Sequence, residues 1–431
     1  MFETLRNAWK VQDIRKKLIY TFFMLMVYRL VSVIPAPGIN AAAVQEVAKN
    51  YDALNLVNMM TGNAFQQMTI MAMGITPYIN ASIIMQLLTI AIPALERMAK
   101  EEGEEGKEKI NKITRYATVV LAALQAIGII SGLNAASFGT SRVLMEGYNN
   151  FLGKLSIGFV MAGGTALAMW IGERVTAKGI GNGISLIIFA GIISNLFNGI
   201  LTAFLDVIGV VPGNTTVVQF LILILFTLGI VFVVTFIDMG ERRIPIQYAK
   251  RVVGRKMYGG QSTHIPIKVM SVGVLPLIFA YSFTAFLGTL ITIIGPNSGI
   301  NAWWQQNMSQ TSWLNLLITG LLIVAFTYFY SSISFNPVDI AKNINQQGGT
   351  IPGIRSGRNT VEFLARTTNR LTLFAAIFLA FLATVPSVLY VWQSVQVPFA
   401  ASSILIAVSV AIETVRQLEA QMVMRNYKGF L

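Results

Sequence analysis

The stretch MAMGITPYINASIIMQLL, residues 71–88, is apolar enough to lie in a membrane, yet it contains a glycine, a proline and two amide side chains. Proline is tolerated in the first turn of a helix, where its missing N–H costs little. Gly74 and Pro77 therefore predict that a short segment turns here into a full membrane-spanning helix.

The residues after this break follow a helical pattern. Ile75, Ile79 and Ile83 share one helical stripe with Gln86, and Asn80 lies on the adjoining face. An amide within a bilayer faces protein or water and not lipid. The pattern therefore predicts a helix that lines an interface or a pore.

The composition of the whole chain indicates a membrane protein. Its 431 residues are 54% hydrophobic and only 12% charged, and its mean hydropathy is +0.63. A soluble protein of this size could not bury so much apolar surface. Apolar runs of about 20 residues match the thickness of a bilayer core. They predict ten spans, at 18–37, 70–92, 113–133, 154–172, 183–202, 216–238, 269–294, 313–335, 371–390 and 399–417.

Lys and Arg gather on alternate predicted loops. The basic segments are 1–17, 93–115, 173–182, 239–268, 334–370 and 416–431. The intervening loops contain only Lys49, Arg142 and Lys154, and Arg29 lies within the first span. By the positive-inside rule, this alternation predicts cytoplasmic termini and an even number of spans.

Ten spans divide naturally into two repeats of five. The second span of each half would then carry a matching break, GITP at 74–77 and GVLP at 273–276. An odd number of spans per repeat gives inverted halves, and interrupted helices at corresponding positions point to a substrate path. Alternatively, glycine and proline are simply common in membrane helices. Segment 54–66 is too short to span, so we expect either a re-entrant half-helix or an interfacial helix.

The sequence offers little that could support catalysis or ion coupling. Cysteine is absent, and the single histidine, His264, lies in a basic loop. Asp206, Asp238 and Glu413 fall near span ends, whereas coupled transporters usually need ionisable or carbonyl-rich sites at mid-membrane. We therefore predict no enzyme, no cofactor, no metal and no direct nucleotide binding. A secondary transporter with inverted repeats remains the alternative, and an intramembrane enzyme a third possibility.

Two basic loops, 239–268 and 334–370, are longer than a tight connection requires. The first interleaves basic residues with Tyr248 and Tyr258, and the second has the glycine-rich tip GGTIPGIRSG, residues 348–357. Such loops can dock on RNA phosphates or on an acidic protein face. Alternatively, their charges only anchor the topology and contact anionic lipid.

Several motifs together resemble the SecY family, the channel-forming subunits of the bacterial Sec protein translocase. They are RLVSVIPAPGI (29–39), MAMGITPYINASIIMQLL (71–88), WIGERVTAKGIGNGISLIIFAGI (170–192), ERRIPIQYAKR (241–251), QSTHIPIKV (261–269), PGIRSG (352–357) and RQLEAQMVMRNYKGF (416–430). The resemblance runs from about residue 13 to the C-terminus. It implies an all-α polytopic membrane protein with ten transmembrane helices in two inverted five-helix halves, 1–202 and 203–431. These halves would surround a central pore closed by a re-entrant plug half-helix.

The resemblance also implies roles for individual residues. The plug, about 54–67, would include Leu56, Met59, Met60 and Gly62. The pore ring would consist of Ile75, Ile79, Ile184, Ile188, Ile278 and Ile406. The lateral gate would comprise Gly74, Pro77, Asn80, Gln86, Pro276, Ser282 and Thr284. The surface for the SecA motor or the ribosome would include Arg242, Arg243, Arg251, Arg255, Lys256 and Arg355. Without the resemblance, the ring isoleucines are typical of ordinary helix packing.

Two expectations about the gate and the loop tip accompany these roles. We expect Asn80 and Gln86 to form hydrogen bonds toward Ser282 and Thr284, each worth about 0.5–2 kcal/mol. Ser356 follows Arg355 where the family commonly has proline, so the loop tip could be looser than in relatives.

From the resemblance we expect a passive, gated channel. It would translocate unfolded preproteins across the bacterial cytoplasmic (inner) membrane and release apolar segments sideways into membrane lipids. SecE and SecG would be its membrane partners, and preproteins with signal sequences its clients. Because no nucleotide site is visible, SecA, the ribosome or the membrane potential would supply the energy.

Overall fold

The computed structural model describes residues 6, 8–48, 58, 61–136, 143–210, 216–248, 251–253, 256–258, 262–294, 298–308, 312–393 and 401–428. Each of the ten predicted spans falls on one long helix within these ranges. They are α2 (Gln12–Val31), α5 (Thr76–Ala91), α7 (Gly103–Ala136), α8 (Phe151–Lys178), α9 (Gly183–Val207), α10 (Val217–Asp238), α11 (Leu275–Ile294), α13 (Trp313–Ser334), α15 (Arg358–Gln393) and α16 (Ala401–Lys428).

These helices make the chain a multi-pass membrane protein. Among the described residues, six helices are long and apolar enough to cross a membrane alone. A seventh candidate is α5 together with α6 (Pro93–Lys100), although the pair is bent by 105°. The 16 residues of α5 rise only about 24 Å, less than the roughly 30 Å of a hydrocarbon core. The segment before α5 therefore has to complete the crossing.

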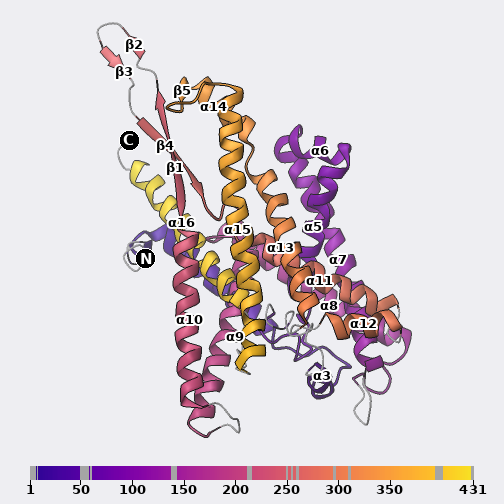
Figure 1. Ribbon diagram of the computed structural model, residues 1–431. Helices are drawn as coiled ribbons and strands as arrows, with labels where there is room; N and C mark the ends of the chain where they lie inside the picture. The colour runs from indigo at the N-terminus through magenta and orange to yellow at the C-terminus, as the bar shows by residue number, and fades with distance from the viewer. Residues whose placement is uncertain are drawn as a thin grey trace.

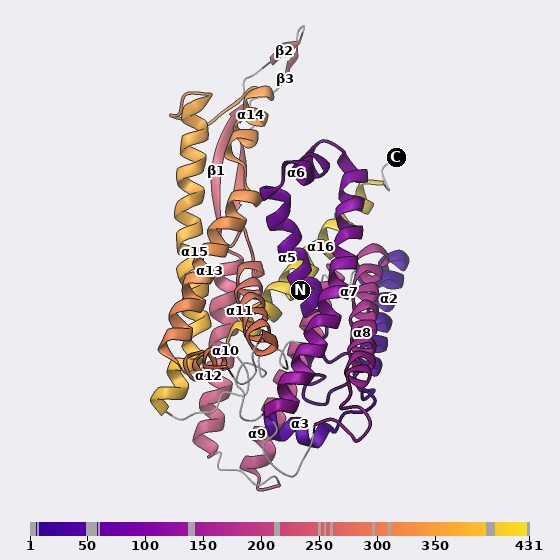
Figure 2. The same ribbon diagram turned by 90° about the vertical axis from the view of Figure 1, so that its right-hand side faces the viewer.

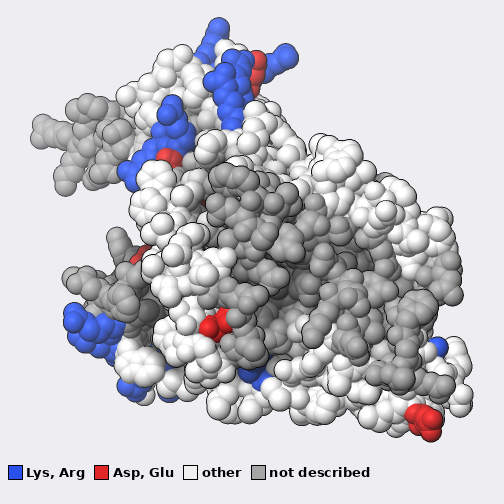
Figure 3. All heavy atoms as spheres, turned by 60° about the horizontal axis from the view of Figure 1, so that its bottom comes forward, with Lys and Arg blue, Asp and Glu red and all other residues white. Residues whose placement is uncertain are grey.

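The basic connections lie together at one end of the helix bundle. In both views α6, α14 (Pro337–Gln346) and the strands β2 (Arg251–Val253) and β3 (Lys256–Tyr258) lie at the top (Figures 1 and 2). The helices α3 (Ala41–Ala48) and α12 (Gly299–Asn307) lie toward the opposite end. Figure 3 tilts that opposite end toward the viewer, and most Lys and Arg side chains visible there lie at the edges of the face. This distribution agrees with the alternation of basic and uncharged loops in the sequence.

Both predicted helix breaks are present, and they share one geometry. Gly74 has a φ of 52° and Gly273 a φ of 62°, a left-handed conformation that glycine adopts without steric cost. Each glycine N–H donates a hydrogen bond three residues back, to Met71 at 2.8 Å and to Met270 at 3.1 Å. A helix then starts within two residues, and its second residue is proline in both cases. The breaks are therefore matching turns at the start of α5 and α11.

The glycine-rich turn between α8 and α9 is a packing feature. Asn182 caps α9 by accepting hydrogen bonds from the N–H groups of Ile184 and Ser185. A Cβ atom on Gly183 would lie 2.0 Å from the carbonyl oxygen of Gly172. Only glycine permits this approach, so the motif brings the start of α9 against α8.

The two long basic loops contain a small sheet that the sequence analysis did not predict. Strand β1 (Glu241–Tyr248) pairs antiparallel with β4 (Ser262–Lys268) and with β5 (Gly349–Thr350). The signal was present in the sequence, because alternate residues of RRIPIQY are apolar and face inward as Ile244 and Ile246. The prediction of a helical membrane fold is confirmed, with this sheet as an addition outside the spans.

The sheet joins the two loops into one packed unit. Ile244, Ile246 and Ile267 pack with residues of α14, of α15 and of the turn after β5, namely Ala341, Ile344, Ile351 and Leu364. The hydroxyl of Tyr248 also donates a 3.3 Å hydrogen bond to Gln347. The described parts of loops 239–268 and 334–370 are therefore packed together as a single projection.

Candidate functional site

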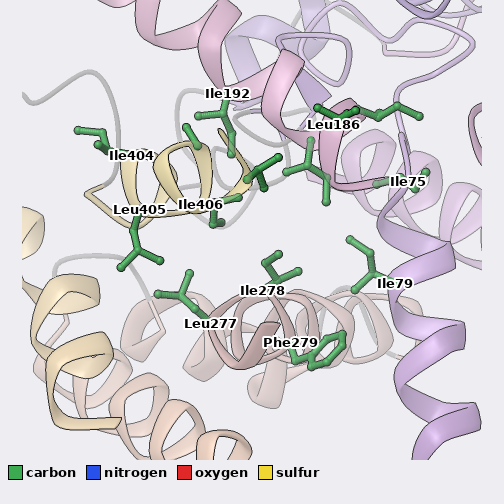
Figure 4. Close-up of a cluster of buried hydrophobic side chains, with 14 of the residues drawn as sticks. Ile75, Ile79, Leu186, Ile192, Leu277, Ile278, Phe279, Ile404, Leu405 and Ile406 are labelled. Atoms are coloured by element: carbon green, nitrogen blue, oxygen red, sulfur yellow. The ribbon is translucent and has the colours of Figure 1, made fainter. Parts of the chain in front are cut away.

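The helices converge on a cluster of buried apolar side chains. Five of the six predicted ring residues are buried in it, with exposed fractions of 2–6% for Ile75, Ile79, Ile188, Ile278 and Ile406. Ile184 is half-buried and packs against the same cluster. In Figure 4, Ile278 and Ile79 point toward the same region, and Ile406 lies across from them on α16. The structure therefore brings the predicted ring residues together, in one cluster.

The two helix breaks position one half of this cluster. Ile75 directly follows Gly74, and its carbonyl accepts the N–H of Ile79 at 3.1 Å. In the second half, Val274 accepts the N–H of Ile278 at 3.2 Å in the same way. Ile79 and Ile278 are thus equivalent residues, because each lies near the start of its helix, five residues after Gly74 or Gly273.

The remaining members come from α9 and α16. Ile184 and Ile188 are one helical turn apart in α9, immediately after the Asn182 cap. Ile406 lies in α16 between Leu405 and Ala407, which are buried in the same cluster. A Cβ atom on Gly172 would lie 3.1 Å from the Ile184 side chain, so this side chain packs closely against the backbone of α8.

The cluster is apolar in character. Its ring members are all isoleucine, and no charged residue is buried among the described members of the cluster. A narrow apolar constriction resists wetting and therefore ion passage, whereas side chains that only pack can separate without breaking hydrogen bonds. Within the described part of the chain, no three His, Asp or Glu side chains could hold a metal ion.

The predicted hydrogen bonds between α5 and α11 are wrong. Gln86 accepts a hydrogen bond from the hydroxyl of Tyr330 in α13, and Thr284 donates to the Ala280 carbonyl of its own helix at 2.8 Å. The reason is geometric. Gln86, about three turns into α5, lies next to α13. The Thr284 hydroxyl is already satisfied by a carbonyl of its own helix. Sequence spacing identified Gln86 as interfacial but not its partner.

Asn80 and Ser282 differ from this prediction in another way. Both are buried, and among the described residues neither the Asn80 amide nitrogen nor the Ser282 hydroxyl has a hydrogen-bond partner. Thr76, one turn before Asn80, has a buried hydroxyl that is likewise without a partner in the described part of the chain. Buried polar groups without partners carry a free-energy cost of about 1–3 kcal/mol each.

The described part of the predicted plug lies beside α2 and α9. Gly62 is buried, and its carbonyl accepts a 2.8 Å hydrogen bond from Arg29. Leu56, Met59 and Met60 lie outside the described residues. Arg29, which the sequence analysis noted only as a charge within the first span, is therefore a structural neighbour of the predicted plug.

The predicted docking residues lie on the loop projection. Arg242 and Arg243 are exposed on β1, and Arg243 forms a 2.6 Å ion pair with Glu241. Arg355 is exposed in the turn after β5, and its carbonyl accepts a 3.2 Å hydrogen bond from Thr360. Arg251 and Lys256 lie on β2 and β3, and Arg255 lies outside the described residues.

Comparison with known proteins gives a consistent result. Residues 69–415 match the SecY family. The protein translocase subunit SecY of Streptomyces galbus is 42% identical over 442 aligned positions, covering 100% of both chains. The corresponding protein of Bacillus subtilis is 40% identical, also over 100% of both chains.

Solved structures agree on the fold. A structure described as a protein conducting channel has a TM-score of 0.67 at 20% identity and covers 94% of this chain and 92% of its own. Sec61 in the canine ribosome–channel complex from the endoplasmic reticulum has a TM-score of 0.64 at 19% identity, with the same coverage.

Proposed function

Because this chain belongs to the SecY family of protein translocase subunits, we propose that its isoleucine cluster is the constriction of a protein-conducting channel. The channel passes unfolded preproteins across the membrane and releases apolar segments sideways into lipid. One observation carries the proposal: six isoleucines, from the starts of α5, α9 and α11 and from α16, lie in or against one buried apolar cluster. The two glycine turns lead directly into the helices that present Ile79 and Ile278 to this cluster.

An isoleucine ring suits a channel whose clients vary in sequence. Apolar side chains make no directional contact with a passing chain, so they neither select nor retain it. They do exclude water and ions when no client is present. A coupled transporter would instead need groups that bind an ion or solute at mid-membrane, and the ring contains none.

Crosslinking to a trapped client tests this proposal. The full chain, with its membrane partners, would carry a single cysteine at Ile79, Ile188 or Ile278, which is possible because the native sequence has no cysteine. We expect a preprotein stalled in transit to crosslink at all three positions. A cysteine at Phe232, which is 72% exposed on α10, is the control. Crosslinks at Phe232 but not at the ring would contradict the proposal.

The contacts around the ring support a gate between α5 and the helices α11 and α13. The Gln86–Tyr330 hydrogen bond joins helices of the two halves in the present arrangement. The Asn80 amide nitrogen and the Ser282 hydroxyl, by contrast, are buried without a partner among the described residues, and opening would give them access to water or to a client backbone. In the proposed gate, Gln86 therefore favours the closed arrangement and Asn80 opposes it.

Opposite effects are expected from two gate substitutions. Tyr330→Phe should shift the channel toward opening by about threefold, because a hydrogen bond between membrane helices averages about 0.6 kcal/mol. Asn80→Leu should shift it toward closing, because it removes a buried donor without a partner at similar volume. The measurement is the translocation rate of a preprotein with a weakly apolar signal sequence. Equal effects of the two variants in one direction would contradict these assignments.

We also propose partners and a location, which the family assignment supports. The loop projection bearing Arg242, Arg243 and Arg355 is a docking surface for the SecA motor or the ribosome, which supplies the energy. SecE and SecG are the membrane companions of the channel. The chain lies in the bacterial cytoplasmic membrane with both termini and the projection on the cytoplasmic side, as the distribution of Lys and Arg supports. The two halves are 1–202 and 203–431, and segment 54–67 is the plug.

A further inference from the structure

Arg29 is a charged residue in the last turn of α2, and its side chain contacts two other segments of the chain. One guanidinium nitrogen donates a 2.8 Å hydrogen bond to the Gly62 carbonyl, and another donates a 2.7 Å hydrogen bond to the hydroxyl of Ser194 in α9. A single side chain of α2 therefore connects segment 61–68 with α9. Arginine suits this role because its planar group presents several donors in a fixed geometry.

The backbone of this segment lies very close to both helices. A Cβ atom on Gly62, whose φ is +66°, would lie 2.5 Å from Arg29 and 3.1 Å from the Cα atom of Gly191. One turn along α9 from Gly191, the amide of Asn195 donates a 3.2 Å hydrogen bond to the carbonyl of Asn58. Asn58 and Gly62 thus both lie against α9, and glycine at position 62 permits the closer approach.

The partners of Arg29 determine how strong this attachment is. A charge within a membrane span is costly unless polar groups surround it. Both hydrogen-bond acceptors of the Arg29 guanidinium in the described chain are neutral, a main-chain carbonyl and a serine hydroxyl. An attachment through neutral acceptors stabilises the docked segment, yet it can be released without separating an ion pair.

We infer that Arg29 is the positioning residue that holds segment 61–68 against α9 in the closed channel. The inference rests on the proposed function, in which this segment belongs to the plug. When a client displaces the segment, the guanidinium keeps Ser194 and exchanges the Gly62 carbonyl for water in the opened path. At Arg29, the docked and displaced arrangements therefore differ by one charge-assisted hydrogen bond.

Cysteine accessibility measures this docking directly. Ala64 is 2% exposed and the chain has no native cysteine, so Ala64→Cys in the otherwise complete channel reports exposure of the segment. A membrane-impermeant maleimide is added from the side of α3 and α12. We expect Arg29→Met to raise the labelling rate about tenfold and Ser194→Ala to raise it about threefold, the factor of a typical hydrogen bond between membrane helices. Arg29→Lys, which keeps the charge and one donor, should restore part of the protection.

The control is Thr202→Ala, because Thr202 lies in α9 and, among the described residues, its hydroxyl bonds within its own helix, to the carbonyl of Asn198. Unchanged labelling in both Arg29→Met and Ser194→Ala would overturn the inference; if Arg29→Met fails to accumulate, Ser194→Ala decides alone. Resting ion leak is recorded in the same vesicles. A rise in labelling without a rise in leak would support the Arg29 attachment but contradict the plug function of the segment.

Discussion

Replacing Ile79 or Ile278 by asparagine is expected to raise the resting ion conductance of the channel by about ten- to a hundredfold. Burying one isoleucine side chain is worth about 1.5–3 kcal/mol, and an amide at the same place attracts the water that the ring excludes. Because Ile79 and Ile278 occupy equivalent places after the two glycine turns, the two single variants should leak to a similar degree. The double variant should leak more than either.

The measurement is conductance or dye efflux in vesicles that contain the channel without a client. Ile79→Val and Ile278→Val are the matched controls, since they keep the apolar β-branched character and remove one methylene group. Stability has to be followed in parallel, because an asparagine in a packed cluster can also destabilise the fold. Unchanged leak in correctly assembled asparagine variants would exclude these isoleucines as the constriction.

The breaks before α5 and α11 show what sequence reasoning predicts well. Gly74 and Gly273, each followed three residues later by a proline, predict a break before the start of a helix, and both signals are local. The spans and the alternation of basic loops can also be predicted from the sequence. Hydropathy and the placement of Lys and Arg depend on whether a segment lies in lipid or in water, and not on which residue it contacts. Local signals of this kind are enough to place Ile75, Ile79 and Ile278 at the starts of their helices.

The pairing of polar side chains was not predictable in this way. Gln86 bonds Tyr330, a residue 244 positions away, because of how α5 and α13 are rotated against each other. Arg29 donates a hydrogen bond to the main-chain carbonyl of Gly62. Because every residue has a main-chain carbonyl, the sequence does not indicate which one accepts this bond. Sequence identifies which residues need partners, whereas packing decides which partners they obtain.

Gly164→Ala is expected to destabilise the protein strongly, because the added methyl group would clash with backbone atoms of a neighbouring segment. A Cβ atom at this position of α8 would lie 2.1 Å from the carbonyl oxygen of Ile70 and 2.7 Å from its carbonyl carbon. The obstacle is backbone, which cannot move as a side chain would. Overpacking of a core typically costs about 1–3 kcal/mol, and we expect the upper end or more here.

The segment around Ile70 has little freedom to retreat. The N–H of Ile70 donates a 2.9 Å hydrogen bond to Ile34, and the N–H of Ala36 donates one of 2.9 Å to Met68. Segment 68–70 is therefore tied to the chain after α2, and it leads directly into the glycine turn that presents Ile75 and Ile79. A displacement by α8 should consequently raise the resting leak as well as lower the melting temperature.

The neighbouring glycine provides the control. Beyond its own helical backbone, no heavy atom of the described residues lies within 4 Å of a Cβ atom built on Gly163, so Gly163→Ala adds the same methyl group to the same helix without a clash. Alanine is favoured over glycine in a helix by about 0.8–1.0 kcal/mol, so this variant should be at least as stable as the parent. A similar melting temperature and leak in both variants would mean that α8 does not press on segment 68–70. In that case the close approach of Gly164 to Ile70 could not be what fixes the position of Ile75 and Ile79.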